Sequence, residues 1–167
     1  MSEKRLGRQT VALSNPPSVL SFANIGGKLE SQGPLAAYFD ELCQDSFFGE
    51  ATWEQGESAM QRRVLTRALQ KGNLEAEDLD YILAGDLLNQ CIGTSFSLRS
   101  FKIPFYGLYG ACSTMGESLS LAALLIDGGF ARRAAAMTSS HFCTAERQYR
   151  MPVPYGSQRP PTAQWTA

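Results

Sequence analysis

The sequence predicts an α/β fold, a mostly parallel, right-handed sheet flanked by helices. Three observations support this class. Short apolar segments alternate with longer segments of helical periodicity, each apolar segment closes on glycine or small polar residues, and 167 residues are enough for one domain with a real core. Ligands of such sheets lie beyond the carboxyl ends of the strands, so residues that directly follow a strand are the first site candidates.

The first half of the chain is expected to hold a leader, a strand and two helices. Residues 1–17 are polar and read as a leader, which leaves residues 18–167 as the domain. Val19 to Ile25 is the first expected strand, ended by two glycines, and Pro34 to Cys43 is a short helix candidate. Glu54 to Lys71 has helical periodicity and ends at Gly72-Asn73. Its expected apolar stripe is Met60, Val64, Leu65, Ala68 and Leu69, and its expected solvent-facing residues are Glu57, Arg62, Arg63 and Arg67.

The second half is expected to hold three further strands. They are Tyr81 to Ala84, closed by Gly85-Asp86, then Pro104 to Tyr109, and then Ala131 to Ser139, which leads to His141. A loop with Asn89 and Cys91 follows the first of them. Since Asp86, Cys112 and His141 each follow a strand, we expect all three at one edge of the sheet.

The segment Gly107 to Leu119 places Cys112 on a glycine-rich turn that runs into an apolar helix. Thr114 and Glu117 have capping-box spacing, which predicts a helix start beside the cysteine. The helix body, residues 118–126, is almost all apolar and is expected to be buried on most sides. Asp127-Gly128-Gly129 is expected to end it. Strand, turn, cysteine and helix together form a nucleophile-elbow arrangement.

This turn fits two chemistries. A helix N-terminus favours the thiolate, so Cys112 could attack an acyl group. The same N–H groups suit a carboxylate or an oxyanion, which would make the turn an anion-binding site. The structural alternative is a small cysteine packed beneath a tight turn, since free cysteine is among the most buried residue types.

Composition excludes several other classes. The net charge is −1 and Lys and Arg are scattered, which gives no indication of a nucleic-acid partner. The four cysteines lie far apart without a C-x-x-C pair, which argues against structural zinc and for reduced thiols. Residues 1–10 lack the apolar core of a secretory signal, and the longest apolar run, residues 119–126, is too short to span a bilayer. We therefore expect a soluble, cytoplasmic chain.

Several motifs together resemble the stage V sporulation protein AD family of the thiolase-like superfamily. They are the run Trp53 to Met60, the stretch Asp80 to Gln90, the Cys112 turn, Thr138 to Phe142 and Pro160 to Trp165. The resemblance implies a thiolase-like protein of two βαβαβ halves, of which this chain would be the first, truncated at its C-terminus. It also implies a homo-oligomer or homodimer in the full-length form.

The resemblance implies a role in sporulation. The family is implicated in the uptake of dipicolinic acid, as its calcium chelate, into the developing spore. It works with stage V sporulation membrane proteins of the same operon, so the expected place is the cytoplasm of the sporulating cell, peripheral to the forespore or spore inner membrane. No cofactor is expected, and calcium would enter only as the ion that the ligand chelates.

Site residues follow from both lines of reasoning. Cys112 aligns with the acyl-carrying cysteine of thiolases, but the His and Asn, or second His, of the thiolase catalytic set belong to the other half. The expected ligand-binding residues are Gly110, Cys112, Ser113, His141, Asp86 and Asn89. For Asp86 and Asn89 a turn or cap role is the stronger reading, and for His141 a hydrogen bond to a backbone carbonyl is an even alternative.

Tyr106 and Tyr109 could pack on the pyridine ring, although ordinary strand packing is the stronger reading for them. The rival function is an acyltransferase or β-ketoacyl synthase-like condensing enzyme with Cys112 as nucleophile. A third reading is a fragment with no function of its own.

Overall fold

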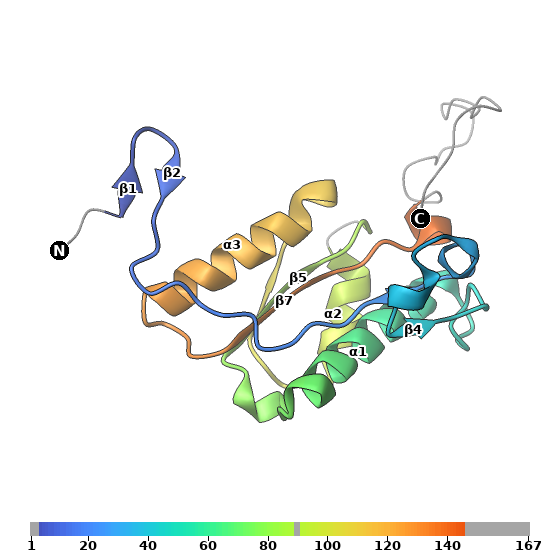
Figure 1. Cartoon of the computed structure of the whole chain (residues 1–167). Helices are drawn as coiled ribbons and strands as arrows, with labels where there is room; N and C mark the ends of the chain where they lie inside the picture. The colour runs from blue at the N-terminus through green and yellow to red at the C-terminus, as the bar shows by residue number, and fades with distance from the viewer. Residues whose placement is uncertain (1–3, 89–90, 146–167) are drawn as a thin grey trace.

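The computed structural model describes residues 4–88 and 91–145. Its centre is a three-stranded parallel sheet in the order β6-β5-β7, formed by β6 (Phe105–Gly107), β5 (Tyr81–Gly85) and β7 (Ala134–Thr138). α1 (Trp53–Gly72) and α2 (Ile92–Leu98) lie on one face of this sheet, and α3 (Thr114–Asp127) lies on the other (Figure 1). The α/β class with a parallel sheet flanked by helices is confirmed.

Each face of the sheet carries its own core. On the α1 and α2 face, Leu65 and Leu69 pack with Ile82, Leu98 and Met137. On the α3 face the buried cluster is smaller. It consists of Leu83, Leu108 and Ala122, with Tyr81, Leu125, Ala134 and Ala136 partly buried against them. Successive residues of β5 thus point to opposite faces, and both faces are covered, as a parallel sheet requires.

Short elements lie outside the central sheet. β1 (Arg5–Leu6) and β2 (Thr10–Val11) form an antiparallel hairpin, and β3 (Ile25–Gly26) pairs in parallel with β4 (Glu41–Leu42). Lys4 forms an ion pair with Asp127 at the end of α3, and the Asn15 N–H donates to the same carboxylate at 2.6 Å. These contacts fasten the N-terminal segment across the end of α3.

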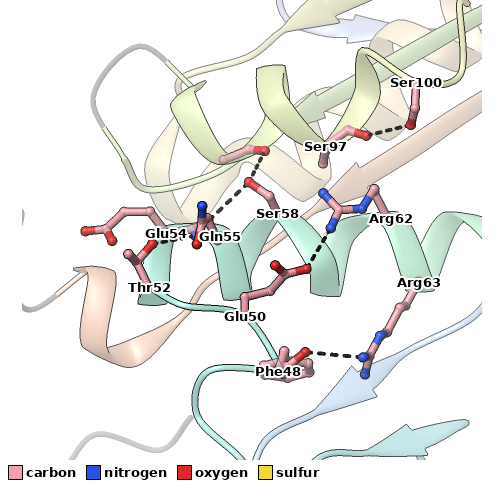
Figure 2. A network of polar contacts seen from close by, with 12 residues as sticks. Phe48, Glu50, Thr52, Glu54, Gln55, Ser58, Arg62, Arg63, Ser97 and Ser100 are labelled. Carbon is pink, nitrogen blue, oxygen red and sulfur yellow. Dashed lines mark hydrogen bonds and ion pairs between the residues drawn. The ribbon is translucent and has the colours of Figure 1, made fainter.

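The polar contacts of α1 fix its position (Figure 2). Thr52 is its N-cap and accepts from the Gln55 N–H at 3.2 Å, and Asn73 ends the helix in the left-handed conformation, as the Gly-Asn pair predicts. Arg62 pairs with Glu50 at 3.1 Å. The Ser58 hydroxyl lies 3.0 Å from the Gly93 carbonyl oxygen, which ties α1 to α2.

Several expectations were wrong. Only Ile25 of the predicted strand Val19 to Ile25 is in a strand, and Pro34 to Cys43 forms a single 3-10 turn (Ala36–Tyr38) followed by β4. α2 was not predicted. Its sequence is rich in Ser, Thr and Gly, which have low helix propensity, and buried hydrogen bonds to α1 stabilise it instead.

The apolar body of α3 is not buried on most sides. Ser118 and Ala122 are buried, but Leu119, Leu121 and Leu124 are exposed, since the sheet covers only one face of the helix in this chain. α3 ends at Asp127, and Gly129 follows with φ +78°, so the predicted glycine stop is confirmed.

Candidate functional site

The Cys112 turn lies on the carboxyl end of the sheet. The chain leaves β6, donates the Leu108 N–H to the Ala84 carbonyl oxygen at 2.8 Å, and passes through a 3-10 turn (Ala111–Ser113) into α3. A Cβ at Gly85 would stand 2.0 Å from the Leu108 carbonyl oxygen and 2.8 Å from Thr114 Cγ2. Only glycine at the end of β5 therefore allows the turn to approach the sheet this closely.

The turn holds its cysteine outward. Cys112 is exposed, and the residue before it, Ala111, has φ +47° in the left-handed region. A non-glycine residue there is strained by about 1–2 kcal/mol, and such strain often marks functional turns. The Ser113 hydroxyl and N–H both donate to the Gly110 carbonyl oxygen, at 2.7 and 3.0 Å. The structural alternative of a cysteine packed beneath the turn does not describe Cys112 in this chain.

The predicted capping box at the start of α3 was wrong. Ser113, not Thr114, is the N-cap residue, and its side chain makes no capping hydrogen bond. Thr114 is buried and its hydroxyl oxygen accepts from the Gly110 N–H at 3.2 Å, which closes the turn instead of capping the helix. A Cβ at Gly110 would meet Glu117 Oε2 at 2.5 Å, so the Glu117 carboxylate lies over the glycine.

A buried polar network lies between α1, α2 and the residues that follow β5 and β7. Glu57, Gln61, Thr94 and Ser139 are its centre, and Asp86, Ser97 and Thr144 complete it. Glu57 was expected to face solvent, which was wrong: none of its surface is exposed. Burial raises the pKa of Glu57, with a further contribution from the nearby negative charge of Asp86.

Gln61 sets the direction of the hydrogen bonds in this network. Its Nε2 donates to Thr94 Oγ1 at 3.1 Å and to Ser139 Oγ at 2.7 Å, and its Oε1 accepts from the Ser97 hydroxyl at 2.8 Å. Since the hydroxyl oxygens of Thr94 and Ser139 accept from Gln61, their own hydrogens point onward. Thr94 donates to Asp86 and Ser139 donates to Glu57, both at 2.6 Å. One amide thus links two buried carboxyl groups.

Asp86 holds the start of the loop after β5. Its Oδ1 accepts from the Leu88 N–H at 2.7 Å, and its Oδ2 accepts from the Thr94 N–H at 2.7 Å and from the Thr94 hydroxyl. This is the turn and cap geometry that the sequence favoured for Asp86. Asn89 lies outside the described residues.

His141 is buried, and its Nε2 lies 2.6 Å from the Ser46 carbonyl oxygen, so Nε2 carries the hydrogen. Its Nδ1 is buried without a hydrogen-bond partner among the described residues. The Phe48 ring packs edge-on against the imidazole at a centroid distance of 6.3 Å. The backbone-carbonyl alternative for His141 is the one that this geometry shows.

Asp86, Cys112 and His141 thus share one edge of the sheet, but among the described residues no hydrogen bond joins them to one another. Asp86, Cys112 and His141 follow the ends of three parallel strands, as expected. Among the described residues, however, no hydrogen bond, ion pair or ring contact joins Cys112 to Asp86 or His141. Tyr106 and Tyr109 are both exposed, and Tyr106 packs on Tyr81 at 5.7 Å between ring centroids.

Sequence reasoning missed Glu57 and Gln61, although a signal was present. They are spaced by four residues and continue the row of Leu65 and Leu69 toward the start of α1, so all four lie on one helix face. A cleft of about 200 Å³ opens beside Gln61 and Ser139, between α1, the end of β7 and residues 23–25.

Two further properties of the described residues bear on the class of site. These residues contain no group of three or more His, Cys, Asp or Glu side chains that could hold a metal ion. None of their helices has the length and apolar character needed to cross a membrane.

Comparison with known proteins gives one family match. The model of the stage V sporulation protein AD family matches residues 7–167. The Bacillus subtilis (strain 168) protein of that name is 44% identical over 160 residues, which cover 96% of this chain and 47% of the relative. The chain therefore spans about half the length of the curated relative that it matches.

A solved structure is also similar. The crystal structure of 3-oxoacyl-[acyl-carrier-protein] synthase III from Aquifex aeolicus VF5 matches with a TM-score of 0.47 and 20% identity. The match covers 52% of this chain and 30% of the synthase. The family match extends over almost the whole chain, and the relative's identity is high over the same span. The chain belongs to the stage V sporulation protein AD family.

Proposed function

We propose that this chain forms part of a dipicolinic acid binding protein that serves the uptake of dipicolinate, with calcium, into the developing spore. Membership of the stage V sporulation protein AD family supports a role in sporulation. The proposed partners are the stage V sporulation membrane proteins of the same operon and a second copy of the full-length protein. The proposed place is the cytoplasmic face of the forespore or spore inner membrane.

The observation that carries the proposal is an exposed turn at the start of a helix, which can bind an anion without a covalent step. Cys112 is exposed at the start of α3, whereas Asp86 and His141 are buried and bonded to backbone groups. Covalent acyl transfer needs a base beside the nucleophile. Binding a carboxylate needs only N–H groups and the positive end of a helix, and the 14-residue α3 presents that end at this turn.

The charges around the turn favour the calcium chelate over the free dianion. Glu117 lies over Gly110 at the proposed binding surface, and the buried Asp86 lies behind the sheet edge. No basic side chain forms an ion pair with these two carboxyl groups among the described residues. Dipicolinate carries two negative charges, which its bound calcium ion offsets, so Glu117 repels the free dianion and attracts the calcium ion of the chelate.

The binding test uses a chain extended to the length of its curated relative. Titration calorimetry is run with dipicolinate alone and with dipicolinate plus calcium. Cys112→Ala is expected to weaken binding only by the loss of contacts. Cys112→Leu is expected to weaken it more, because the larger side chain covers the outer surface of the turn. Glu117→Gln is expected to tighten binding of the free dianion and to weaken binding of the chelate. Equal effects on both ligands would contradict this placement.

The acyltransferase alternative is favoured by one observation, the strained Ala111 directly before an exposed cysteine. Intact-mass measurement after incubation with an acyl-CoA tests it. A stable acyl adduct on Cys112 that Cys112→Ala abolishes, together with no dipicolinate binding, would reverse the ranking of the two functions.

A further inference from the structure

Glu57 is a buried carboxyl group that holds one short segment from both sides. Its Oε1 accepts from the Ser139 hydroxyl and its Oε2 from the Thr144 hydroxyl, both at 2.6 Å. These two residues lie on either side of His141 in the segment that follows β7, which we call the 139–145 segment. While this segment is in place, no surface of Glu57 is exposed. Movement of the segment away from α1 would admit water to the carboxyl group.

A second carboxyl group lies close by. A Cβ at Gly93 would stand 3.3 Å from Asp86 Oδ2 and 3.5 Å from Glu57 Cγ. The side chains of the two acids therefore approach each other beside this glycine. Two carboxyl groups in a shared buried site resist being ionised together. Asp86 accepts from two backbone N–H groups, which can only donate, so both of its oxygens are held as acceptors. Glu57 is bonded only to hydroxyl groups, which can either donate or accept.

Thr144 has one hydroxyl hydrogen and two acceptors within reach. Its Oγ1 lies 2.6 Å from Glu57 Oε2 and 2.9 Å from the His141 carbonyl oxygen. With Glu57 ionised, the hydrogen points to the carboxylate. With Glu57 protonated, the carboxyl O–H donates to Thr144, and the Thr144 hydrogen turns to the His141 carbonyl. The geometry thus satisfies both protonation states, but only the charged state carries the cost of burial.

We propose that Glu57 is a proton-linked clasp: its protonated carboxyl group keeps the 139–145 segment closed on α1, and loss of that proton favours release of the segment. The direction follows from linkage. The closed form binds the proton more tightly than an open form in which water reaches Glu57, so a rise in pH favours opening. The raised pKa of Glu57 in the closed form agrees with this direction. The inference is independent of which ligand the sheet edge binds.

The other ionisable groups near Glu57 come from each element that packs against it. Asp86 follows β5, Cys91 precedes α2, His141 and Cys143 belong to the segment, and Asp45 lies in the loop that bonds His141. Glu54 and Arg62 lie on α1, and Arg62 is paired with Glu50. The charge of Asp86 raises the pKa of Glu57 and that of His141 lowers it, so these are the two neighbours whose charge acts on Glu57.

The experiment is hydrogen exchange of the full chain between pH 4.5 and 8, with the protection of peptides from residues 139–145 compared with that of peptides from α3. The amides of Ser139 and Ala145 are hydrogen-bonded and report on closure. Above the ordinary pKa of a glutamate, protection of the segment is expected to fall by up to about tenfold per pH unit until the raised pKa is passed, while α3 does not follow. Glu57→Gln copies the protonated state and is expected to remove this dependence.

Two further variants and a control complete the test. Thr144→Val removes the hydrogen-bond partner of both protonation states, and the bond to the charged carboxylate is the stronger of the two. The fall in protection is therefore expected to extend to higher pH, and Thr144→Ser is expected to restore the wild-type midpoint. Glu77→Gln makes the same charge change on an exposed residue and is expected to change nothing. A pH dependence that persists in Glu57→Gln would assign the titration to another group, His141 first, and overturn the proposal. An unmoved midpoint in Thr144→Val would overturn it as well.

Discussion

Replacement of Gly85 by alanine should damage the Cys112 turn more than the loss of any side chain near it. An added Cβ would stand 2.0 Å from the Leu108 carbonyl oxygen, whereas real Cβ contacts are essentially never closer than 3.0 Å. Either β5 or the Leu108 backbone must therefore move by about 1 Å, the difference between these two distances. That movement separates partners that hold the turn on the sheet.

The expected cost can be worked from the contacts that would be disturbed. The Leu108 N–H donates to Ala84 at 2.8 Å, and the Cys91 thiol lies 3.2 Å from the Leu108 carbonyl oxygen. Loss of one backbone hydrogen bond costs about 1 kcal/mol, and overpacking against backbone costs about 1–3 kcal/mol. Gly85→Ala should therefore lower the free energy of unfolding by about 2–4 kcal/mol.

Gly116 supplies the matched control. It lies in the first turns of α3, only a few residues from Cys112, and a Cβ there would meet nothing within 4 Å. Because alanine is about 1 kcal/mol better than glycine inside a helix, Gly116→Ala should be neutral or stabilising. Urea unfolding followed by circular dichroism measures both variants, and the alkylation rate of Cys112 reports on the turn. Equal stabilities for Gly85→Ala and Gly116→Ala would refute the close approach of turn and sheet.

Three other predictions follow from the structure. Cys112 should react with iodoacetamide faster than Cys43, Cys91 or Cys143. It alone of the four is exposed, and burial raises the pKa of Cys91. Mass spectrometry of the labelled, folded chain would contradict this prediction if Cys112 reacted more slowly than the others or at the same rate. The chain by itself should self-associate through the exposed Leu119 and Leu124 of α3, and Leu119→Lys with Leu124→Lys should reduce this in sedimentation velocity, whereas a wild-type monomer that unfolds cooperatively would rule it out. Lys4→Met should lower the melting temperature at pH 7 but not at about pH 2. The Lys4 hydrogen bond lowers the pKa of Asp127, so the stabilisation from this pair is lost as the pH falls through that lowered pKa. A difference in melting temperature that stays constant across the pH range would argue against this prediction.

The sequence predicted the elements whose periodicity is long and whose ends carry glycine or asparagine. α1, β5, α3 and β7 were found in this way, with Asn73 and Gly129 at the helix ends. The strand from Val19 failed because its apolar residues pair with no neighbouring strand over residues 19–24. A propensity pattern describes only the segment itself, while strand pairing depends on a partner elsewhere in the chain.

The candidate site was predicted only where backbone geometry decides it. The Cys112 turn followed from glycines and a strand end, and the structure has it there. The buried network was missed because charge was taken as a mark of solvent exposure. Glu57 and Gln61 are hydrogen-bonded in the interior to the hydroxyl groups of Thr94, Ser139 and Thr144, which come from α2 and the 139–145 segment. The four-residue row in α1 indicates the buried face, but nothing in α1 identifies these partners.

The left-handed Ala111 has a consequence for protein engineering. Glycine at this position would remove about 1–2 kcal/mol of strain and give back roughly 0.5–1 kcal/mol through a freer unfolded chain. A selection for heat resistance alone would therefore favour glycine before Cys112. The same exchange would widen the range of directions that the thiol samples. Libraries built to make this chain more robust should keep alanine fixed at this position if the thiol's orientation is to survive.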